Sequence, residues 1–209
     1  MNTSLRKVLE QKGSHVYVTS PAQSILDAIK TMQDKKVGGL LVVEDGKPVG
    51  MFTERDVLTR VAAHEFDPAN TNVSEVMTKK VITVAEDTPI EEAARIMADN
   101  KIGGLPVMRD SHVVGIITET DLFKVFLELM GARENGVRVT ALIEEKPGQL
   151  AKITEAIANA GGNFVAFGQF AGEDPSTRLV TFKVAGLKKD EVKKAVSEIA
   201  KEIWDVREI

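Results

Sequence analysis

An internal repeat organises the first two-thirds of this 209-residue chain. The segment Val37–Val42 recurs 65 residues later as Ile102–Val107. The same spacing holds without a gap along the whole stretch from Val16–Asp56 to Val81–Asp121. Each copy has only about 60 residues, which is close to the lower limit for an independent hydrophobic core. We therefore expect the two copies to fold against each other.

The spacing changes upstream of this stretch. Leu5–Leu9 corresponds to Val73–Met77 at a spacing of 68 residues, so the first copy carries three extra residues around Lys12–Ser14.

Each copy has the pattern strand, helix, strand, strand, helix. The first strands are expected at Val16–Val18 and Val81–Thr83. The first helix of each copy carries apolar residues at i, i+3, i+4 and i+7, which is typical of one buried face. In the first copy these are Ile25, Ala28, Ile29 and Met32, and in the second they are Ile90, Ala93, Ala94 and Met97. Two apolar strands follow, joined in the first copy by a turn at Asp45-Gly46.

A different pattern begins after the polar stretch 131–136, which is bracketed by glycines and predicts a domain boundary. The order of elements there is βαββαβ, which matches the ferredoxin-like arrangement. The strands are expected at Val137–Ile143, Phe164–Phe170, Leu179–Val184 and Ile203–Val206, and the helices from Pro147-Gly148 to about Asn159 and at Lys189–Lys201. The fold class is therefore α+β throughout.

The most specific local motif is Gly50–Asp56, which is repeated as Gly115–Asp121. In each copy a threonine ends a strand, and an aspartate follows three residues later where a helix begins. One interpretation is a helix cap close to the capping-box pattern. The other is a phosphate site, because a helix N-terminus presents free amide donors to an anion and the aspartate can accept from two ribose hydroxyls.

On these residues the two copies resemble a tandem pair of CBS domains, with the segment Gly-apolar-x-Thr-x-x-Asp intact twice. The resemblance implies domains at residues 1–66 and 67–131, a linker at 132–136, and two clefts that bind an adenosine-containing ligand such as AMP, ADP, ATP or S-adenosylmethionine. Carried over by position, Thr53 and Thr118 contact phosphate, whereas Asp56 and Asp121 contact ribose. The base is then expected against Val16, Val18, Leu40, Val81, Thr83 and Leu105.

Arg55 distinguishes the two copies, because Thr120 stands at the equivalent position. A guanidinium beside a phosphate motif is suited to bidentate phosphate contact. The alternative is an ordinary solvated charge on a helix. If Arg55 binds phosphate, the two clefts differ in their affinity for AMP and ATP.

Residues 137–209 resemble an ACT domain. The similarity is carried by Glu145–Leu150, an acid-x-Pro-Gly-x-Leu turn, and by Gly161-Gly162-Asn163 before the second strand. It implies that two copies pair side by side and bind a free amino acid at the joint between them, with Gly148, Gln149, Leu150 and Asn163 as the contacts. Glu145 stands where the family usually has aspartate. The alternative is a simple helix start at Pro147-Gly148 and a turn residue at Asn163.

The helix that ends the second copy is almost wholly apolar over residues 122–130. A helix that is apolar around its circumference is expected to be buried in the core of the pair, or partly against another subunit.

Composition excludes several classes of function. The chain has no cysteine and three histidines (His15, His64 and His112), so no disulfide, thiolate or metal site is expected. The residues after Met1 contain no apolar run, and no stretch is long enough to cross a bilayer, which predicts a cytoplasmic protein without membrane contact. The common nucleotide, serine-nucleophile and zinc signatures of enzymes are absent. The net charge of −4 offers no positive footprint for nucleic acid.

These observations predict a non-catalytic regulatory sensor, with an adenosyl ligand in the CBS pair and a free amino acid at the ACT domain. The combination is similar to bacterial acetoin-utilisation regulators. A homodimer is expected, acting on an unidentified effector protein. The alternative is a ligand-free module that assembles a partner enzyme or pathway.

Overall fold

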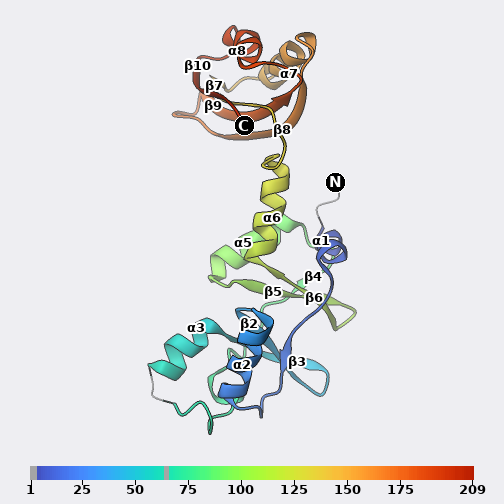
Figure 1. Cartoon of the computed structure of the whole chain (residues 1–209), viewed down its shortest axis with the longest axis vertical. Coiled ribbons are helices and arrows are strands. Elements are labelled where there is room, and N and C mark those ends of the chain that lie inside the picture. Colours follow the sequence, from blue (N-terminus) through green and yellow to red (C-terminus); the bar gives the residue numbers. More distant parts are fainter. Residues whose placement is uncertain (1–3, 64–65) are drawn as a thin grey trace. The chain divides into compact units, whose positions relative to one another are not determined.

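The computed structural model describes residues 4–63 and 66–209 (Figure 1). The first three residues, on which the expectation of a missing signal partly depends, and His64 lie outside the described part. The chain divides into two compact units, Met1–Leu122 and Phe123–Ile209. Each unit is described by itself below.

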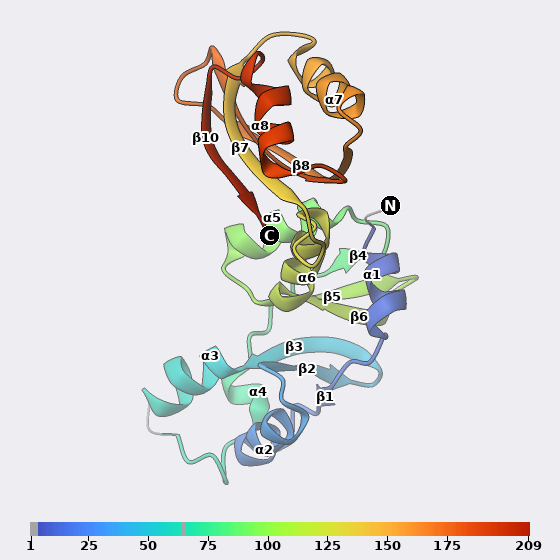
Figure 2. The ribbon, with the colours of Figure 1, turned by 45° about the horizontal axis from the view of Figure 1, so that its top comes forward.

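The first unit contains both repeats, and each builds a three-stranded mixed sheet (Figure 2). The sheets have the orders β1-β2-β3 and β4-β5-β6. In the first repeat the elements are β1 (Val18–Thr19), α2 (Ile25–Lys35), β2 (Gly39–Glu44), β3 (Lys47–Thr53), α3 (Glu54–Asp56) and the π-helical turns η1 (Val57–Ala62). In the second they are β4 (Val84–Ala85), α5 (Ile90–Asn100), β5 (Gly104–Arg109), β6 (His112–Thr118) and α6 (Glu119–Leu129), which crosses the boundary between the units.

The short first strands lie later than the sequence predicted. Val16–Val18 and Val81–Thr83 were expected, but β1 and β4 begin at Val18 and Val84. In the first repeat the amide of Leu41 donates to the carbonyl of Tyr17 at 3.1 Å. Pro106 stands at the position of Leu41 in the second repeat and has no N–H to donate. Pairing there therefore starts only at Val84 with Val107.

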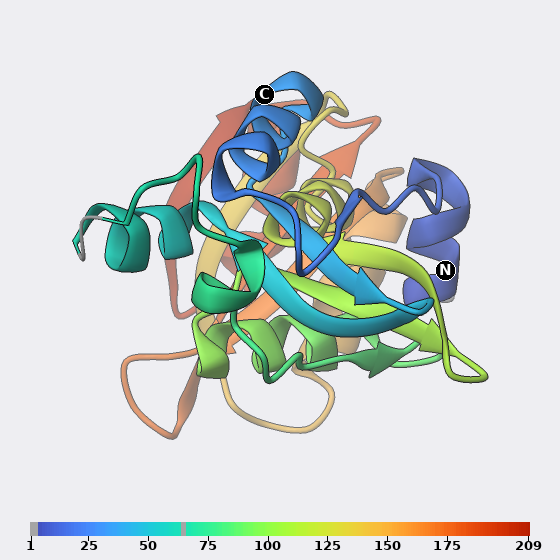
Figure 3. The same cartoon turned by 90° about the horizontal axis from the view of Figure 1, so that it is seen from below.

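The two repeats exchange their N-terminal segments. Helix α1 (Leu5–Lys12) packs on β6 of the second repeat, and α4 (Val73–Val76) packs on β3 of the first. Figure 3 shows α1, in dark blue beside the N-terminus, next to the green strands of the second repeat. A Cβ added at Gly115 would lie 2.5 Å from a methyl of Leu9, and one at Gly50 would lie 2.5 Å from the sulfur of Met77. Each repeat thus completes the core of the other.

Ion pairs also attach α1 to the second repeat. Arg6 donates to Glu86 at 2.7 Å, and Arg109 donates to the other oxygen of the same carboxylate. The hydrogen bond from Arg109 is the main cause that lowers the pKa of Glu86, and Arg6 adds to it. Because Glu86 stays ionised well below neutral pH, the attachment persists across the physiological range.

The second unit has the predicted order βαββαβ. Its elements are β7 (Val137–Glu144), α7 (Gln149–Asn159), β8 (Asn163–Ala171), β9 (Thr177–Ala185), α8 (Lys189–Ser197) and β10 (Glu202–Glu208). The sheet is antiparallel with the order β10-β7-β9-β8, as in a split βαβ arrangement. The second helix was expected to reach Lys201 but ends at Ser197. The amide of Lys201 donates to the carbonyl of Leu142 in β7, so the chain has already left the helix.

The core of the second unit lies between the sheet and its two helices. It is formed by alternate residues of β7 and β9 together with Ile153, Ile157, Val192 and Val196. Lys183 of β9 is 3% exposed, and its ammonium donates to the carbonyls of Gly131 and Glu134. The predicted linker is therefore bonded to the sheet of the second unit.

The apolar end of α6 is not buried in the core of the pair, which was one of the two expectations, and its burial against another subunit stays a prediction. Phe123, Phe126 and Leu129 are 67%, 54% and 53% exposed in the single chain. Over the described residues, no helix combines the length and the apolar character that a membrane span needs.

Candidate functional site: two Thr-x-x-Asp motifs and a turn in the second unit

The first Thr-x-x-Asp motif forms a closed cap at the end of β3. The amide and the hydroxyl of Thr53 donate to Oδ2 of Asp56 at 2.9 and 2.7 Å. The amide of Asp56 donates back to the Thr53 hydroxyl at 3.4 Å. This is the predicted capping box, and it holds the Asp56 carboxylate at 5% exposure.

The second motif has almost the same geometry at the end of β6. The amide and the hydroxyl of Thr118 donate to Oδ2 of Asp121 at 2.9 and 2.8 Å. Asp121 is also 5% exposed. The repeat in the sequence is thus a repeat of one local hydrogen-bonded structure.

The glycine pairs of the repeat lie beside these caps. The amide of Glu54 donates to the carbonyl of Gly38 at 3.0 Å, and Glu119 donates to Gly103 at 3.2 Å. A Cβ at Gly38 would lie 3.5 Å from the Glu54 carboxylate. Two motifs far apart in each repeat therefore meet where β2 or β5 begins and the helix starts.

The acids of the two motifs differ in their further partners. Oδ1 of Asp56 accepts from the Thr78 hydroxyl at 3.3 Å and lies 3.4 Å from the guanidinium of Arg60. Asp121 instead accepts from the ammonium of Lys12, the last residue of α1. Burial raises the pKa of Asp121, but the hydrogen bonds from Lys12 and Thr118 outweigh that effect and leave the pKa below its ordinary value.

Arg55 makes a contact between the repeats. Its guanidinium donates to the carbonyl of Lys101 at 2.7 Å on the exposed surface. Lys101 is the left-handed residue that ends α5. The guanidinium is thus engaged and is more than the solvated charge of the simpler interpretation.

The residues expected around the base fall into two groups. Val18 is 53% exposed, Thr83 is exposed, and Val16 and Val81 are half-buried, so these four are accessible at least in part. Leu40 and Leu105 have no exposed surface and belong to the core. For these two leucines, only the backbone is available to a ligand.

Residues expected to bind an amino acid line a cleft of about 490 Å³ in the second unit. Gly148, Gln149 and Leu150 contribute to it, together with Glu145 and Arg178. Gly148 has a φ of 86° and precedes α7, so its left-handed conformation favours glycine.

The acids of this cleft are already paired. Arg178 donates to Glu145 and is the main cause that lowers its pKa. Lys146 lies 3.0 Å from Glu144 and lowers the pKa of that carboxyl in the same way. An incoming ammonium group would therefore compete with cations of the chain.

Asn163 is not brought to this cleft. It is the exposed first residue of β8, after the end of α7, whereas Gly148 precedes the start of the same helix. Eleven helical residues rise about 16 Å, which separates the two positions.

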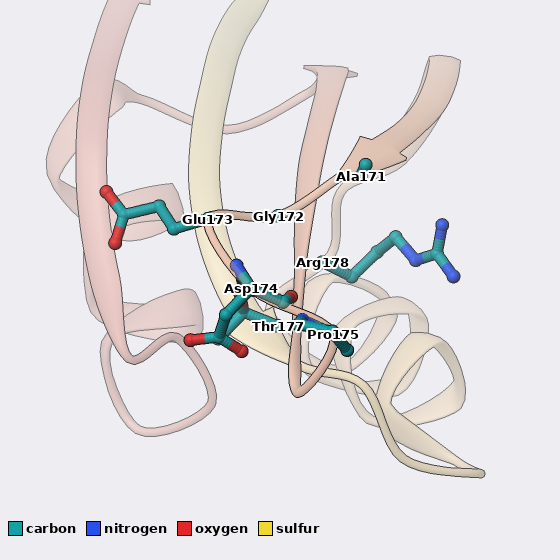
Figure 4. Close-up of a pocket in the computed structure, with 7 residues that line it drawn as sticks. All are labelled: Ala171, Gly172, Glu173, Asp174, Pro175, Thr177 and Arg178. Atoms are coloured by element: carbon teal, nitrogen blue, oxygen red, sulfur yellow. Dashed lines mark hydrogen bonds between the residues drawn. The ribbon is translucent and has the colours of Figure 1, made fainter.

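A smaller hollow of about 360 Å³ lies inside the β8–β9 turn (Figure 4). Asp174 accepts from the amide and the hydroxyl of Ser176 at 2.7 and 2.6 Å. The polar groups of the turn thus bond to one another. Over the described residues, no group of three or more histidine or acidic side chains is placed to hold a metal.

Sequence reasoning missed the partners of the two aspartates, namely Lys12, Arg60 and Thr78. Lys12 had a signal, because it begins the three-residue insertion that changes the repeat spacing. Thr78 had none, because its contact depends on the exchange of segments between the repeats.

Comparison with known proteins identifies the first unit. The CBS domain family matches residues 13–63 and 73–128, just over half of the chain. The chain is 30% identical over 153 residues to the mitochondrial CBS domain-containing protein CBSX3 of Arabidopsis thaliana, a match that covers 68% of this chain and 73% of that protein. It is 34% identical over 118 residues to CBS domain-containing protein YhcV of Bacillus subtilis, covering 56% of this chain and 84% of that protein.

A solved structure supports the same conclusion. The CBS domain pair of protein MJ0100, crystallised with 5′-methylthioadenosine and S-adenosyl-L-methionine, is 31% identical with a TM-score of 0.52. The match covers 59% of this chain and 98% of that one. The two exchanged repeats with their capped Thr-x-x-Asp motifs define a CBS domain pair. The chain belongs to the CBS domain family.

Proposed function

We propose that this protein is a non-catalytic sensor that binds an adenosine-containing ligand in the two clefts of its CBS pair. The observation that carries the proposal is the duplicated cap, in which a buried carboxylate stands beside a threonine and a helix N-terminus in both repeats. We propose that the threonine hydroxyl, which donates to the aspartate in this structure, turns to a phosphate at the helix N-terminus, and that the fixed carboxylate accepts from the two hydroxyls of ribose.

The family relationship supports the class of ligand. The CBS pair of MJ0100 was crystallised with two adenosyl compounds. For this chain we propose AMP, ADP, ATP or S-adenosylmethionine, with Thr53 and Thr118 at phosphate and Asp56 and Asp121 at ribose. The exposed Val18 and Thr83 lie on the side proposed for the base, with Val16 and Val81 partly accessible.

A thermal-shift experiment tests the proposal with AMP, ADP, ATP, S-adenosylmethionine and NAD. A ligand present at about 100 times its dissociation constant is expected to add about 2.7 kcal/mol of stability. Asp121→Asn, which keeps the size of the side chain, is expected to reduce the shift. The absence of a shift with every adenosyl compound would contradict the proposal.

Arg55 has its own test in the first cleft. We propose that its guanidinium moves from the Lys101 carbonyl to the phosphate of a bound nucleotide. Arg55→Ala is then expected to weaken nucleotide binding to the first cleft alone, as measured by calorimetry. Unchanged nucleotide affinity would limit Arg55 to the contact between the repeats.

For the second unit we propose an ACT domain that binds a free amino acid at the turn before α7. The cleft beside Gly148, Gln149 and Leu150 and the βαββαβ order support this proposal. A thermal-shift panel of the twenty amino acids tests it, with Gln149→Ala as the variant and Asn163→Ala as its comparison. Because Asn163 lies away from the cleft, only the first substitution is expected to weaken binding within one copy.

The second candidate is a module that assembles a partner enzyme without binding a ligand. The exposed apolar residues of α6 favour it, because a homodimer or an effector protein would cover them. The proposed resemblance to acetoin-utilisation regulators belongs to the sensor and not to this second candidate. Sedimentation of the wild-type chain and of Phe123→Ser tests whether this surface forms the dimer. The thermal-shift panel separates the two candidates, because only the sensor is expected to be stabilised by an adenosine ligand.

A further inference from the structure

We propose that Lys12 makes the second cleft selective for adenosine ligands that carry a 5′-phosphate, over uncharged or cationic adenosyl compounds. This inference rests on the proposed function and decides among the ligand classes that the CBS resemblance leaves open. It depends on a residue that the repeat does not predict, because Lys12 begins the three-residue insertion of the first copy.

The position of Lys12 is fixed by the packing of α1 on the second repeat. Leu9 fills the space over Gly115, and Arg6 is paired with Glu86 at 2.7 Å. Gly13 then ends the helix with a φ of 90°, and its amide donates to the carbonyl of Leu9 at 2.9 Å. Lys12 is therefore the last residue of a helix that is held by the packing of Leu9 and by the ion pair of Arg6.

The Lys12 ammonium and the Thr118 hydroxyl converge on one atom. Both donate to Oδ2 of Asp121, Lys12 at 2.5 Å and Thr118 at 2.8 Å. The Lys12 nitrogen and the Thr118 hydroxyl oxygen are thus no farther apart than the sum of these two distances. A phosphate bound at Thr118 would lie within reach of the ammonium, and a charge-assisted hydrogen bond to phosphate is roughly twice as strong as a neutral one.

The partial burial of the pair makes the charge matter. The Asp121 side chain is 6% exposed and the Lys12 side chain 23% exposed, although Lys12 as a residue lies at the surface. The Asp121 carboxylate keeps its charge when ribose hydroxyls bind it, and the ammonium, which has three N–H donors, can also donate to a second anion. A 5′-phosphate supplies that anion, a thioether does not, and a sulfonium adds a second positive charge close to the first.

The first repeat has no described cation that matches Lys12 in position. The charge beside Asp56 is Arg60, whose guanidinium also donates to the carbonyls of Val76 and Met77 at 2.9 and 3.1 Å. Lys80 corresponds to Lys12 at the upstream spacing of 68 residues, and it is exposed, and in the described part of the chain it has no hydrogen bond to Asp56. Arg55, proposed above to reach a phosphate in the first cleft, donates to the Lys101 carbonyl and is not paired with the aspartate. The selectivity due to Lys12 is therefore assigned to the second cleft.

Calorimetry of the full chain with AMP and with 5′-methylthioadenosine tests this inference at low ionic strength. The wild-type protein is expected to bind AMP at least tenfold more tightly than 5′-methylthioadenosine at one site. Lys12→Met is expected to lower the AMP affinity of that site about tenfold and to leave the 5′-methylthioadenosine affinity within twofold. Lys12→Arg is expected to restore AMP binding, because it keeps the charge.

Lys80→Met is the matched control and is expected to change neither affinity. Lys12→Gln repeats the test with a polar neutral side chain should the methionine variant fold poorly. An equal change for both ligands in Lys12→Met, or no change for either, would overturn the assignment of Lys12. A wild-type chain that binds neither compound but does bind another adenosine ligand would overturn this inference alone. A wild-type chain that binds no adenosine ligand would overturn the proposed function, and this inference with it.

Discussion

The two repeats of the CBS pair share one local structure and differ in the groups that bond its aspartate. In both, the amide and the hydroxyl of a threonine donate to a buried aspartate at closely similar distances. The aspartate of the first repeat is also bonded by Thr78 and paired with Arg60, which lies four residues further along its own repeat, whereas that of the second is bonded by Lys12 of α1. Duplication therefore repeats the Thr-x-x-Asp structure, whereas Lys12 and Thr78 make the surroundings of the two aspartates chemically different.

Substitution of the glycines that lie beneath Leu9 and Met77 is expected to have the largest effect on stability. Gly115→Ala forces a methyl group against Leu9, and Gly50→Ala forces one against Met77. Overpacking of this kind costs about 1–3 kcal/mol at each position. Met77 is flexible, but a Cβ at Gly50 would also lie 3.2 Å from the backbone oxygen of Thr78. Chemical denaturation of both variants measures the difference.

Gly104→Ala serves as the control, because its nearest non-neighbouring atoms would lie at ordinary contact distances of 3.4 Å or more. Equal stability of Gly104→Ala and Gly115→Ala would argue against close packing of α1 on the second repeat.

Removal of the cap tests what the two repeats have in common. Thr53→Val and Thr118→Val each delete the hydroxyl that bonds the aspartate. Each is expected to lower the free energy of unfolding by about 1 kcal/mol, the usual cost of losing an N-cap side chain. A loss at only one of the two positions, measured by urea denaturation, would show that the caps are not equivalent.

Acidic pH is expected to destabilise the packing of α1 on the second repeat. Asp121 and Glu86 both have lowered pKa values in the folded chain. Each stabilises the fold at neutral pH, and that contribution is lost as the pH falls below the ordinary carboxyl range of about 4 towards the lowered values. The hydrogen-exchange protection factors of the α1 amides are therefore expected to fall in acid before those of α2.

The Lys12→Met variant, in which Asp121 loses its cation, should show a smaller loss of stability between pH 7 and 3. An unchanged pH dependence in that variant would mean that the pair contributes nothing to the attachment of α1.

Loss of the Arg55 contact is expected to have the smallest effect. Arg55→Ala removes one exposed hydrogen bond to the carbonyl of Lys101. Exposed charged contacts contribute about 0–1 kcal/mol, so the melting temperature should fall only slightly. A large fall would show that this contact holds the repeats together more strongly than the exchanged segments do.

Much of the fold could be predicted from the sequence, because its signals are local. The Thr-x-x-Asp spacing predicted both caps, and apolar periodicity predicted α2 and α5 and the βαββαβ order of the second unit. The delayed start of β4 follows from Pro106, a single residue whose missing amide could have been noticed.

The remaining features depend on contacts between distant segments. The pairing of Lys12 with Asp121 joins α1 to the second repeat, and the contact of Arg55 with Lys101 joins the two repeats, so neither follows from a local sequence pattern. The distance between Asn163 and the Gly148 cleft reflects the length of α7 between them. The exposure of Phe123 and its neighbours in the single chain could not be predicted. An apolar helix pattern predicts burial but does not identify the surface against which the helix packs.

The most direct test of the proposed ligand site is equilibrium binding of AMP to the full chain and to Asp121→Asn. We expect saturable binding to the wild-type chain. We expect the affinity of one site to be at least tenfold weaker in Asp121→Asn, while the circular-dichroism spectrum of the folded protein is unchanged. Equal binding of AMP by the two proteins, or no saturable binding of any adenosine compound by the wild-type chain, would contradict it.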